Sequence, residues 1–252
     1  MIIKLTILLP ICIKRLKLIL TIHQPEYMPW LGFFAKLAAA ETYVVLDNVQ
    51  YRHKYFQNRN KIRGANNDTW INVPVLRKGE RNTLIKDIKI NNALNWKRKN
   101  WMNIKSNYSK APYFENYSSY FENLFLSDWE LLVDLNLNII KACLEFLNIN
   151  TKIYRASELG IENTGEQLIL DICNFYKPDV YISGKSGIAG QGHKYESEFL
   201  KNNIKVLYQK FNHPKYKQAH NREFSSNMSV IDLLFNHGPD SLDIIKQESY
   251  YE

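Results

Sequence analysis

The hydrophobic positions of the chain alternate between short runs typical of buried strands and longer runs with helical spacing. An apolar segment at 18–22 leads into a polar turn, and an apolar run of helical length follows from Trp30 to Ala40. A second apolar, β-branched segment covers residues 42–46. A strand, a helix and a strand in this order predict a βαβ unit with parallel strands and a right-handed crossover.

The same patterns predict the elements of the remaining chain. Helical spacing dominates the middle, where Ser127 to Glu130 forms a capping box before an apolar helix. A second capping box at 164–167 precedes another helix, and we expect a last helix at 230–235. Further strands are predicted at 70–75, 85–90, 180–183 and 204–208. The sequence therefore predicts an α/β fold with a mostly parallel, Rossmann-like sheet and a helical middle segment.

We expect one α/β domain over residues 18–245, with a helical insertion at about 94–148. The 252 residues, 45% of them hydrophobic, suffice for a full core. Residues 1–17 are expected to be a disordered or weakly packed extension, because the apolar run at 6–13 is much shorter than the roughly twenty residues that span a bilayer. A peripheral membrane contact is the alternative for this extension. The tail at 246–252 is expected to fray.

The charge and cysteine content narrow the classes of partner. The net charge is +8, which suits an anionic ligand, but no run of five or more basic residues occurs, so we expect no nucleic-acid partner. Cys12, Cys143 and Cys173 lie far apart without a CxxC pair. This usage is typical of a reducing compartment, and we expect a cytoplasmic protein without a membrane span.

The first candidate site is the turn that follows the first predicted strand. His23, Gln24 and Glu26 come directly after the strand, and Tyr27 and Trp30 lead into the helix. A histidine beside a strand end and a helix N-terminus is placed to bind phosphate or to transfer a proton. An ordinary strand–helix turn is the alternative interpretation.

The second candidate site begins at Asp47, which ends the neighbouring predicted strand. Because the carboxyl ends of parallel strands open on one edge of a sheet, we expect Asp47 near His23 as a catalytic partner. The following segment is rich in amide, cationic and phenolic groups, which suit planar polar ligands. Its candidate substrate-binding residues, beside Gln24, Tyr27 and Trp30, are Gln50, Tyr51, Gln57, Arg59 and Asn60. A solvated amphipathic segment is the alternative.

A glycine-rich loop after the strand at 180–183 is the third candidate. Gly184, Lys185, Ser186 and Gly187 resemble a phosphate loop, but Asp179 stands where a Walker A motif needs its first glycine. A looser phosphate-binding nest and a plain loop both remain open. The histidines and cysteines have no metal-site spacing, so we expect no metal site, and the dinucleotide fingerprint is missing after the first strand.

Several motifs occur together in a specific order. They are Ile22-His23-Gln24-Pro25, Pro29-Trp30-Leu31-Gly32-Phe33, Leu46-Asp47, Gln57-Asn58-Arg59-Asn60, Val73-Pro74-Val75, Ser183-Gly184 and the segment 229–239. In this order they resemble the WbqC-like family over about residues 18–245. The strand, histidine turn and helix also resemble the nucleotidyltransferase-like Rossmann group, although that group usually has a pair of histidines where this chain has one.

The WbqC-like family is associated with bacterial surface-polysaccharide gene clusters, including those for the O-antigen of lipopolysaccharide. The resemblance implies a transferase that forms an amide by adding an aminoacyl group, such as glycyl, or another acyl group to a nucleotide-linked amino sugar. The donor would be activated by ATP with Mg²⁺, a carrier protein or coenzyme A, and the cofactor is otherwise unknown. In this interpretation His23 is the general base, oriented by Asp47, while Arg59 and the Gly184 loop hold pyrophosphate.

Two other functions remain open at this point. Nucleotidyl transfer to a sugar phosphate or related metabolite would make a nucleotide sugar in place of consuming one, and it would need a triphosphate and magnesium. A non-catalytic scaffold of a polysaccharide assembly complex would use the basic surface and residues 1–17 to reach the membrane.

Overall fold

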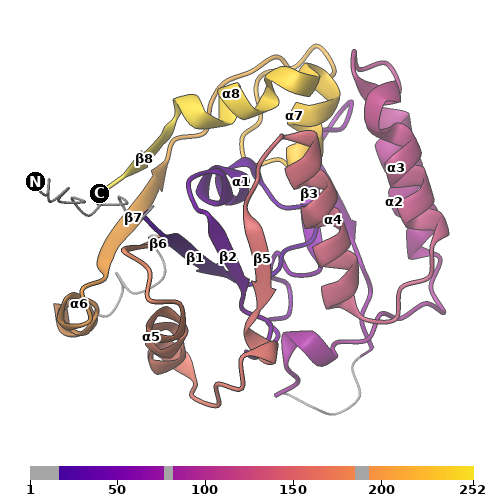
Figure 1. Ribbon diagram of the computed structural model, residues 1–252. Coiled ribbons are helices and arrows are strands. Elements are labelled where there is room, and N and C mark those ends of the chain that lie inside the picture. Colours follow the sequence, from indigo (N-terminus) through magenta and orange to yellow (C-terminus); the bar gives the residue numbers. More distant parts are fainter. Residues whose placement is uncertain (1–16, 77–81, 185–192) are drawn as a thin grey trace, which may run out of the picture.

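A six-stranded sheet forms the centre of the computed structural model, which describes residues 17–76, 82–184 and 193–252 (Figure 1). The first five strands in sheet order are parallel, and the last is antiparallel to its neighbour. This confirms the predicted α/β class with a mostly parallel, Rossmann-like sheet. In sheet order the strands are β5 (Lys152–Arg155), β2 (Thr42–Val45), β1 (Ile19–His23), β6 (Val180–Gly184), β7 (Lys205–Phe211) and β8 (Ser249–Tyr251).

The order of the strands creates a topological switch point beside β1. From β1 the chain passes through α1 (Leu31–Ala38) to β2 on one side, and β5 pairs with β2 further out. The next strand, β6, pairs with β1 on its other side. In open α/β sheets, ligands bind outside the carboxyl ends of the strands at such a point, because the connecting segments diverge there and leave a crevice.

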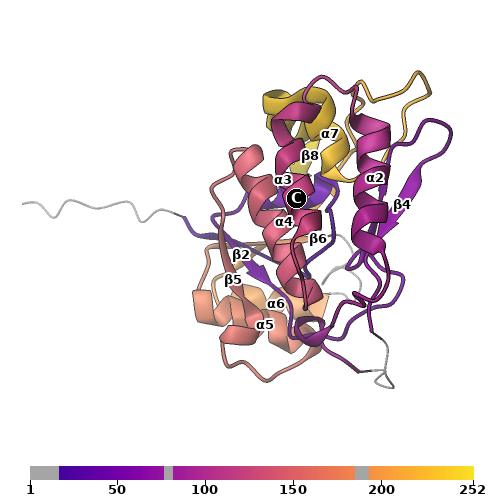
Figure 2. The same cartoon turned by 90° about the vertical axis from the view of Figure 1, so that its right-hand side faces the viewer.

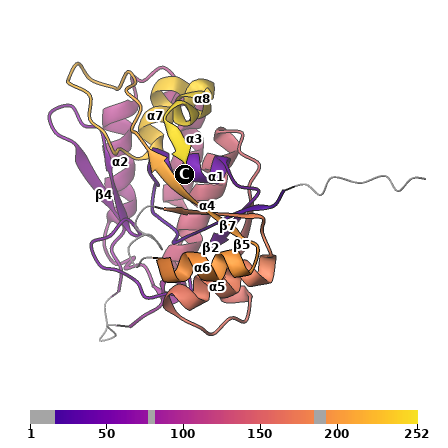
Figure 3. The ribbon, with the colours of Figure 1, turned by 90° about the vertical axis from the view of Figure 1, so that its left-hand side faces the viewer.

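Helices cover both faces of the sheet. One face carries α5 (Gly165–Tyr176) and α6 (His193–Lys201), as Figure 3 shows. The other face carries α1, and beside it lie α4 (Leu132–Phe146), α7 (Val230–His237) and α8 (Ser241–Gln247). Outside these, α2 (Trp96–Tyr108) and α3 (Phe114–Leu126) pack side by side in an outer layer (Figures 1 and 2).

The alternation of side chains along β2 divides the core between these two faces. Tyr43 and Val45 belong to the larger hydrophobic cluster with α1 and α4, whereas Val44 belongs to the cluster under α5 and α6. Successive side chains of a strand point to opposite faces, so a strand buried on both sides is apolar at nearly every position. β2 is buried at all four of its positions.

A small antiparallel hairpin, β3 (Arg59–Ile62) and β4 (Thr69–Asn72), lies outside the main sheet. It packs beside α2, as Figure 2 shows. Asn100 of α2 donates one hydrogen bond of 3.0 Å to the carbonyl of Asn72 and another of 3.1 Å to the hydroxyl of Tyr27. The helical layer therefore supports both the hairpin and the turn after β1.

The first predicted capping box is wrong. Ser127 ends α3, where its hydroxyl donates to the Asn123 carbonyl, and α4 begins only at Leu132. Glu130, the other half of the motif, pairs with Lys89 at 2.7 Å. Local spacing matched a helix start, but a sharp change of chain direction between two helices uses the same residue types.

Two other segments also differ from the prediction. Residues 85–90 do not form a strand: a short 3-10 helix spans Ile85–Asp87, followed by isolated bridges from Lys89 and Ile90. The C-terminal tail does not fray, because Ser249–Tyr251 pair with β7 as β8. The extension at 1–16 lies outside the described residues. Within the residues that the structure describes, no helix is long and apolar enough to cross a membrane.

Candidate functional site

A cleft of about 690 Å³ opens at the topological switch point, and we call it the switch-point cleft. The last residues of three parallel strands reach it: His23 of β1, Gly184 of β6 and Phe211 of β7. The first two turns of α1 form a second wall, and the segment that contains Tyr55 and Phe56 forms a third. Its volume lies in the usual range of roughly 300–1,000 Å³ for small-molecule sites.

His23 is held in the cleft as a neutral ring. Its Nδ1 lies 2.9 Å from the carbonyl oxygen of Gln24, so this nitrogen carries the proton and Nε2 is left as an acceptor. The ring edge packs against Phe33, with 5.2 Å between ring centroids. Burial, together with the positive charge of Lys36, lowers the pKa of His23 to about 3. At neutral pH the ring is therefore uncharged and a weak proton acceptor.

Glu26 and Lys36 form a buried pair of ionisable groups at the same cleft. Their exposed fractions are 4% and 2%. Burial raises the pKa of Glu26 to about 7, although the charge of Lys36 opposes this shift. Burial lowers the pKa of Lys36 to about 8, against the charge of Glu26. Both groups therefore titrate close to neutral pH, as groups that transfer protons or bind charged ligands do.

One oxygen of Glu26 is poised to accept a hydrogen bond. Its Oε2 atom is buried and has no hydrogen-bond partner among the described residues. An unpaired buried acceptor costs free energy, so a site that contains one is completed when a ligand brings a donor. An amine or hydroxyl group of a bound ligand would supply that donor.

The aromatic wall of the cleft depends on a glycine in α1. The Trp30 indole packs edge-on against Phe211, with ring centroids 5.4 Å apart. It also lies over Gly32, where a Cβ atom would come within 2.3 Å of the indole ring. The Gly32 carbonyl accepts a hydrogen bond of 2.9 Å from Gln209 of β7. A glycine at this position thus lets the indole fold onto the helix start and close one side of the cleft.

The structure places three of the residues predicted from the sequence in this cleft: His23, Trp30 and Gly184. Gln24 and Gln57 do not line the cleft but contact each other, because Gln57 Nε2 donates a hydrogen bond of 2.7 Å to Gln24 Oε1. The remaining residues of the predicted phosphate loop, Lys185, Ser186 and Gly187, lie outside the described residues. Their role stays a prediction.

Asp47 serves a different partner from the one we expected. Its carboxylate accepts hydrogen bonds from Arg155 Nε at 2.7 Å, from the Ser157 amide at 3.0 Å and from the Ser157 hydroxyl at 2.8 Å. These bonds join the ends of β2 and β5. The group that orients the His23 ring is the Gln24 carbonyl. Asp47 therefore positions strand ends in the structure, and not the imidazole.

Tyr27 and Asn60 are buried within the support of the turn. Tyr27 is fully buried and its hydroxyl accepts a hydrogen bond from Asn100. Asn60 is also fully buried and donates to the carbonyl of Met28, a residue in the left-handed conformation at φ 46°. Left-handed backbone is costly for a side chain such as methionine, so these bonds hold a shape that the turn would otherwise avoid.

The structure does not bring Arg59, Gln50 and Tyr51 into the cleft. Arg59 stacks on Trp70, with its guanidinium carbon 4.4 Å from the ring centroid, and lines a separate hollow of about 430 Å³. Gln50 is exposed and its amide lies 3.4 Å from Asn82. Tyr51 packs against the main core. The alternate positions of Gln57 and Arg59 therefore do not deliver both side chains to one ligand site.

Sequence reasoning missed Lys36 and assigned no role to Glu26. The signal for Lys36 was present, because it is the one charged residue in the apolar stretch from Leu31 to Ala38. Such a residue is expected on the solvent side of a helix, yet this helix is buried around nearly all of its circumference. No group of three or more His, Cys, Asp or Glu side chains suited to a metal ion occurs in the described part of the chain.

A mostly parallel sheet with helices on both faces defines a Rossmann-like α/β protein, and the cleft of buried ionisable groups at its switch point is its candidate site. Comparison with known families goes one step further: the chain belongs to the WbqC-like protein family, whose model matches residues 24–244. It is similar to the uncharacterized protein Rv1507c of Mycobacterium tuberculosis, with 26% identity over 227 residues, which cover 89% of this chain and 96% of that protein. No solved structure matches the chain significantly.

Proposed function

We propose that this protein is a transferase of bacterial O-antigen or other surface-polysaccharide biosynthesis that forms an amide on a nucleotide-linked amino sugar. Membership of the WbqC-like family supports a polysaccharide-related role. The observation that carries the proposal is the cluster of His23, Glu26 and Lys36 in the switch-point cleft. It combines a neutral imidazole with an acid and an amine that both titrate near pH 7 to 8.

Amide formation needs a general base. The sugar nitrogen attacks an activated acyl carbon, the new C–N bond forms as the bond to the leaving group breaks, and the nitrogen must lose a proton. A base works best when its pKa lies near the operating pH. Glu26 meets this condition, whereas His23 is too weak a base in its buried state. We therefore propose that the Glu26 carboxylate is the general base that accepts this proton.

His23 and Lys36 receive supporting roles in this mechanism. His23 Nε2 accepts a hydrogen bond from the amine of the sugar and so aligns the nitrogen lone pair with the acyl carbon. The Lys36 ammonium offsets the negative charge that develops on the acyl oxygen or is carried by the leaving group. Gly184 lines the cleft, and a Cβ atom built there meets none of the described residues within 4 Å.

The walls of the cleft suit a nucleotide-linked sugar. Trp30 and Phe211 pack together on one side of the cleft, and Tyr55, which is 40% exposed, belongs to another wall. Aromatic faces stack on nucleobases and on the apolar faces of sugars. The acyl or aminoacyl donor would arrive activated by ATP with Mg²⁺, by a carrier protein or by coenzyme A.

The test uses the full-length purified protein. It is incubated with a panel of nucleotide-linked amino sugars, with glycine and other amino acids plus ATP and Mg²⁺ in one arm and with acyl-coenzyme A in another, and products are followed by mass spectrometry. We expect a mass increase equal to one acyl or aminoacyl group. Glu26→Gln should slow the reaction by about two to four orders of magnitude. Glu145→Gln, at an exposed site on α4, is the matched control and should leave the rate unchanged.

No product from any combination of sugar and donor would overturn the amide proposal. The position of the histidine, at the end of β1 and before α1, favours nucleotidyl transfer as the second candidate. That reaction would release pyrophosphate from a nucleoside triphosphate and a sugar phosphate without any amine or acyl donor. Incubations with nucleoside triphosphates, Mg²⁺ and sugar 1-phosphates, without amino acids or acyl-coenzyme A, therefore separate the two reactions.

A further inference from the structure

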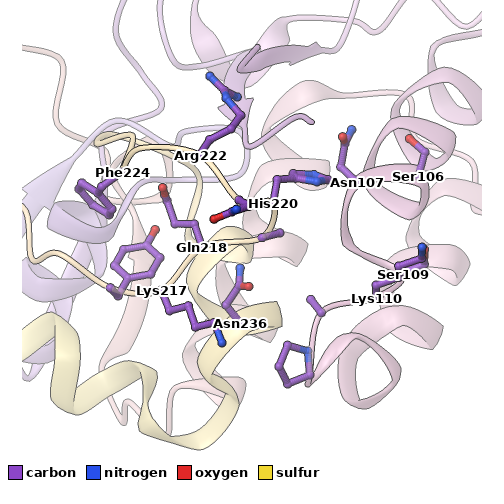
Figure 4. Close-up of a pocket in the computed structure, with 15 residues that line it drawn as sticks. Ser106, Asn107, Ser109, Lys110, Lys217, Gln218, His220, Arg222, Phe224 and Asn236 are labelled. Atoms are coloured by element: carbon purple, nitrogen blue, oxygen red, sulfur yellow. The ribbon is translucent and has the colours of Figure 1, made fainter. Parts of the chain in front are cut away.

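A second cavity, of about 770 Å³, lies between the end of α2 and the loop at 216–224, and we call it the α2-loop cavity. Figure 4 shows Ser106, Asn107, Ser109 and Lys110 on its helical side and Lys217, Gln218, His220 and Phe224 on its loop side. None of the described residues that line it also lines the switch-point cleft. It is therefore a separate site.

The charged side chains that line the α2-loop cavity are all basic. Lys110, Lys217 and Arg222 line it, and no carboxylate is among its lining residues in the described part of the chain. Arg222 is engaged by the protein, since it donates to the Gly64 carbonyl at 2.8 Å and lies 3.8 Å from Asp68. The two lysines are exposed at the rim. The cavity thus favours a ligand with negative charge.

Neutral hydrogen-bonding groups also line the cavity, and three of them already donate within the protein: Gln218 to Ser225 and Asp232, Asn236 to Asp232, and Asn107 to Asn103. Four carboxamides line it, together with His220. The Nε2 atom of His220 is buried without a hydrogen-bond partner among the described residues. Burial and the nearby charges of Arg63 and Arg222 lower the pKa of His220, which keeps the ring neutral. The carboxamides are Asn107, Gln218, Asn221 and Asn236.

The loop side of the cavity is braced from behind. Asp232 of α7 is fully buried and accepts hydrogen bonds from the Tyr216 hydroxyl at 2.8 Å and from Gln218 Nε2 at 2.9 Å. Gln218 is also tied to Ser225 by two bonds of 2.8 Å, one in each direction. Tyr216 packs edge-on against Phe224, with ring centroids 5.4 Å apart. A surface held in place before binding loses little entropy when a ligand arrives.

We propose that the α2-loop cavity binds an acidic sugar, meaning a monosaccharide unit that carries a carboxylate or a phosphate. The exposed carboxamide of Asn221 and the unpaired Nε2 of His220 match the mixed donor and acceptor character of sugar hydroxyls. The aromatic rings Tyr216 and Phe224 match the apolar face of a pyranose ring. The rim lysines match the acidic group of such a sugar. A neutral sugar would leave these lysines without a charged partner. This proposal does not depend on the reaction assigned to the switch-point cleft.

Calorimetric titration of the full-length protein tests the proposal. The probes are glucose, glucose 6-phosphate, glucuronate and inorganic phosphate. We expect glucose 6-phosphate or glucuronate to bind about tenfold or more tightly than glucose. The comparison of the two acidic sugars shows whether phosphate or carboxylate is preferred. Rising salt should weaken the binding of both, because the contacts at the rim are exposed to solvent.

Substitutions in the lining test whether the acidic sugars bind in this cavity. Replacing both Lys110 and Lys217 by alanine should weaken the acidic sugars by about tenfold. Lys215→Ala is the matched control: this exposed lysine comes directly before the loop and does not line the cavity, so the variant should bind as the wild type. Lys36→Met should also leave this binding unchanged, because Lys36 belongs to the switch-point cleft.

Any one of four results would overturn the proposal. Acidic sugars that bind no better than glucose would remove the charge preference. Inorganic phosphate that binds as tightly as glucose 6-phosphate would show an anion site that does not recognise sugar. Unchanged binding in the double lysine variant, or a loss in Lys36→Met, would place the ligand elsewhere. Salt dependence and probe preference are measured on the wild type, so both remain decisive if the double variant does not fold.

Discussion

Arg155 Nε donates a hydrogen bond of 2.7 Å to Asp47 Oδ2, which joins two residues 108 positions apart. Asp47 is fully buried, whereas the arginine side chain is 26% exposed. Ser157 adds two further bonds to the same carboxylate. The carboxyl ends of β2 and β5 are therefore tied together beside the switch-point cleft.

The bonds of Asp47 predict a role in stability. Asp47→Ala should lower the free energy of unfolding by about 2–4 kcal/mol, because it leaves the donors of Arg155 and Ser157 without their acceptor. Urea denaturation followed by circular dichroism measures this loss. Asp134→Ala is the matched control: Asp134 lies 3.6 Å from the same arginine but is half exposed, so its loss should cost less than about 1 kcal/mol. Asp47→Asn protein that is fully folded yet catalytically dead would contradict this assignment.

Glu26 and Lys36 predict the pH profile of the reaction. The rate should rise as Glu26 loses its proton near pH 7 and fall as Lys36 loses its charge near pH 8, which gives a narrow bell-shaped profile. Initial rates of product formation between pH 5 and pH 10 would show it, and Glu26→Gln should lose the acidic limb. An acidic limb that persists in Glu26→Gln would assign the base to another group.

The raised pKa of Glu26 also predicts how stability depends on pH. The folded protein binds the Glu26 proton more tightly than the unfolded chain does, so this group stabilises the fold less as pH rises from about 4.5 to about 7. Relative to Glu26→Gln, the wild type should lose about 3 kcal/mol of unfolding free energy over this range. Paired urea titrations at several pH values measure the difference. A difference that is constant with pH would show that Glu26 keeps an ordinary pKa.

Gly32→Ala tests the packing of Trp30. Alanine normally favours a helix over glycine by up to about 1 kcal/mol. Here the added Cβ would lie 2.3 Å from the indole ring, so we expect a net destabilisation of about 1–2 kcal/mol, together with weaker ligand binding in the cleft. In a Trp30→Ala background the clash is absent, and the same substitution should become neutral or stabilising. Equal effects of Gly32→Ala in the two backgrounds would refute the explanation.

Local pattern was enough to predict the framework of the fold. The segments around β1, α1 and β2 were recognised because buried strands are apolar throughout and a helix of eight or more residues shows its own spacing. The mistakes fell where the same residue types serve different geometries. Ser127 ends a helix in place of starting one, and the tail at 249–251 becomes a strand because β7 offers it an edge.

The candidate site was predicted in part. The turn after β1 was identified, and His23, Trp30 and Gly184 do line one cleft. The partners within that cleft were not predictable, because ionisation depends on burial and on charges that approach through space. From the sequence alone, Lys36 is expected on the solvent side of its helix. Its effect on the pKa values of Glu26 and His23 follows only from the packing of α1, which buries it.

The sequence by itself determined the α/β class, the parallel sheet and the family, because these depend on periodicity and on ordered motifs along the chain. The tertiary structure alone decided which polar groups share a site. In the folded protein Asp47 bonds to Arg155, and Arg59 stacks on Trp70. Glu26 and Lys36 line the same cleft as the neutral ring of His23. The physical reason is that hydrogen bonding and desolvation act between side chains in three dimensions, and the distances that govern them are absent from the order of residues.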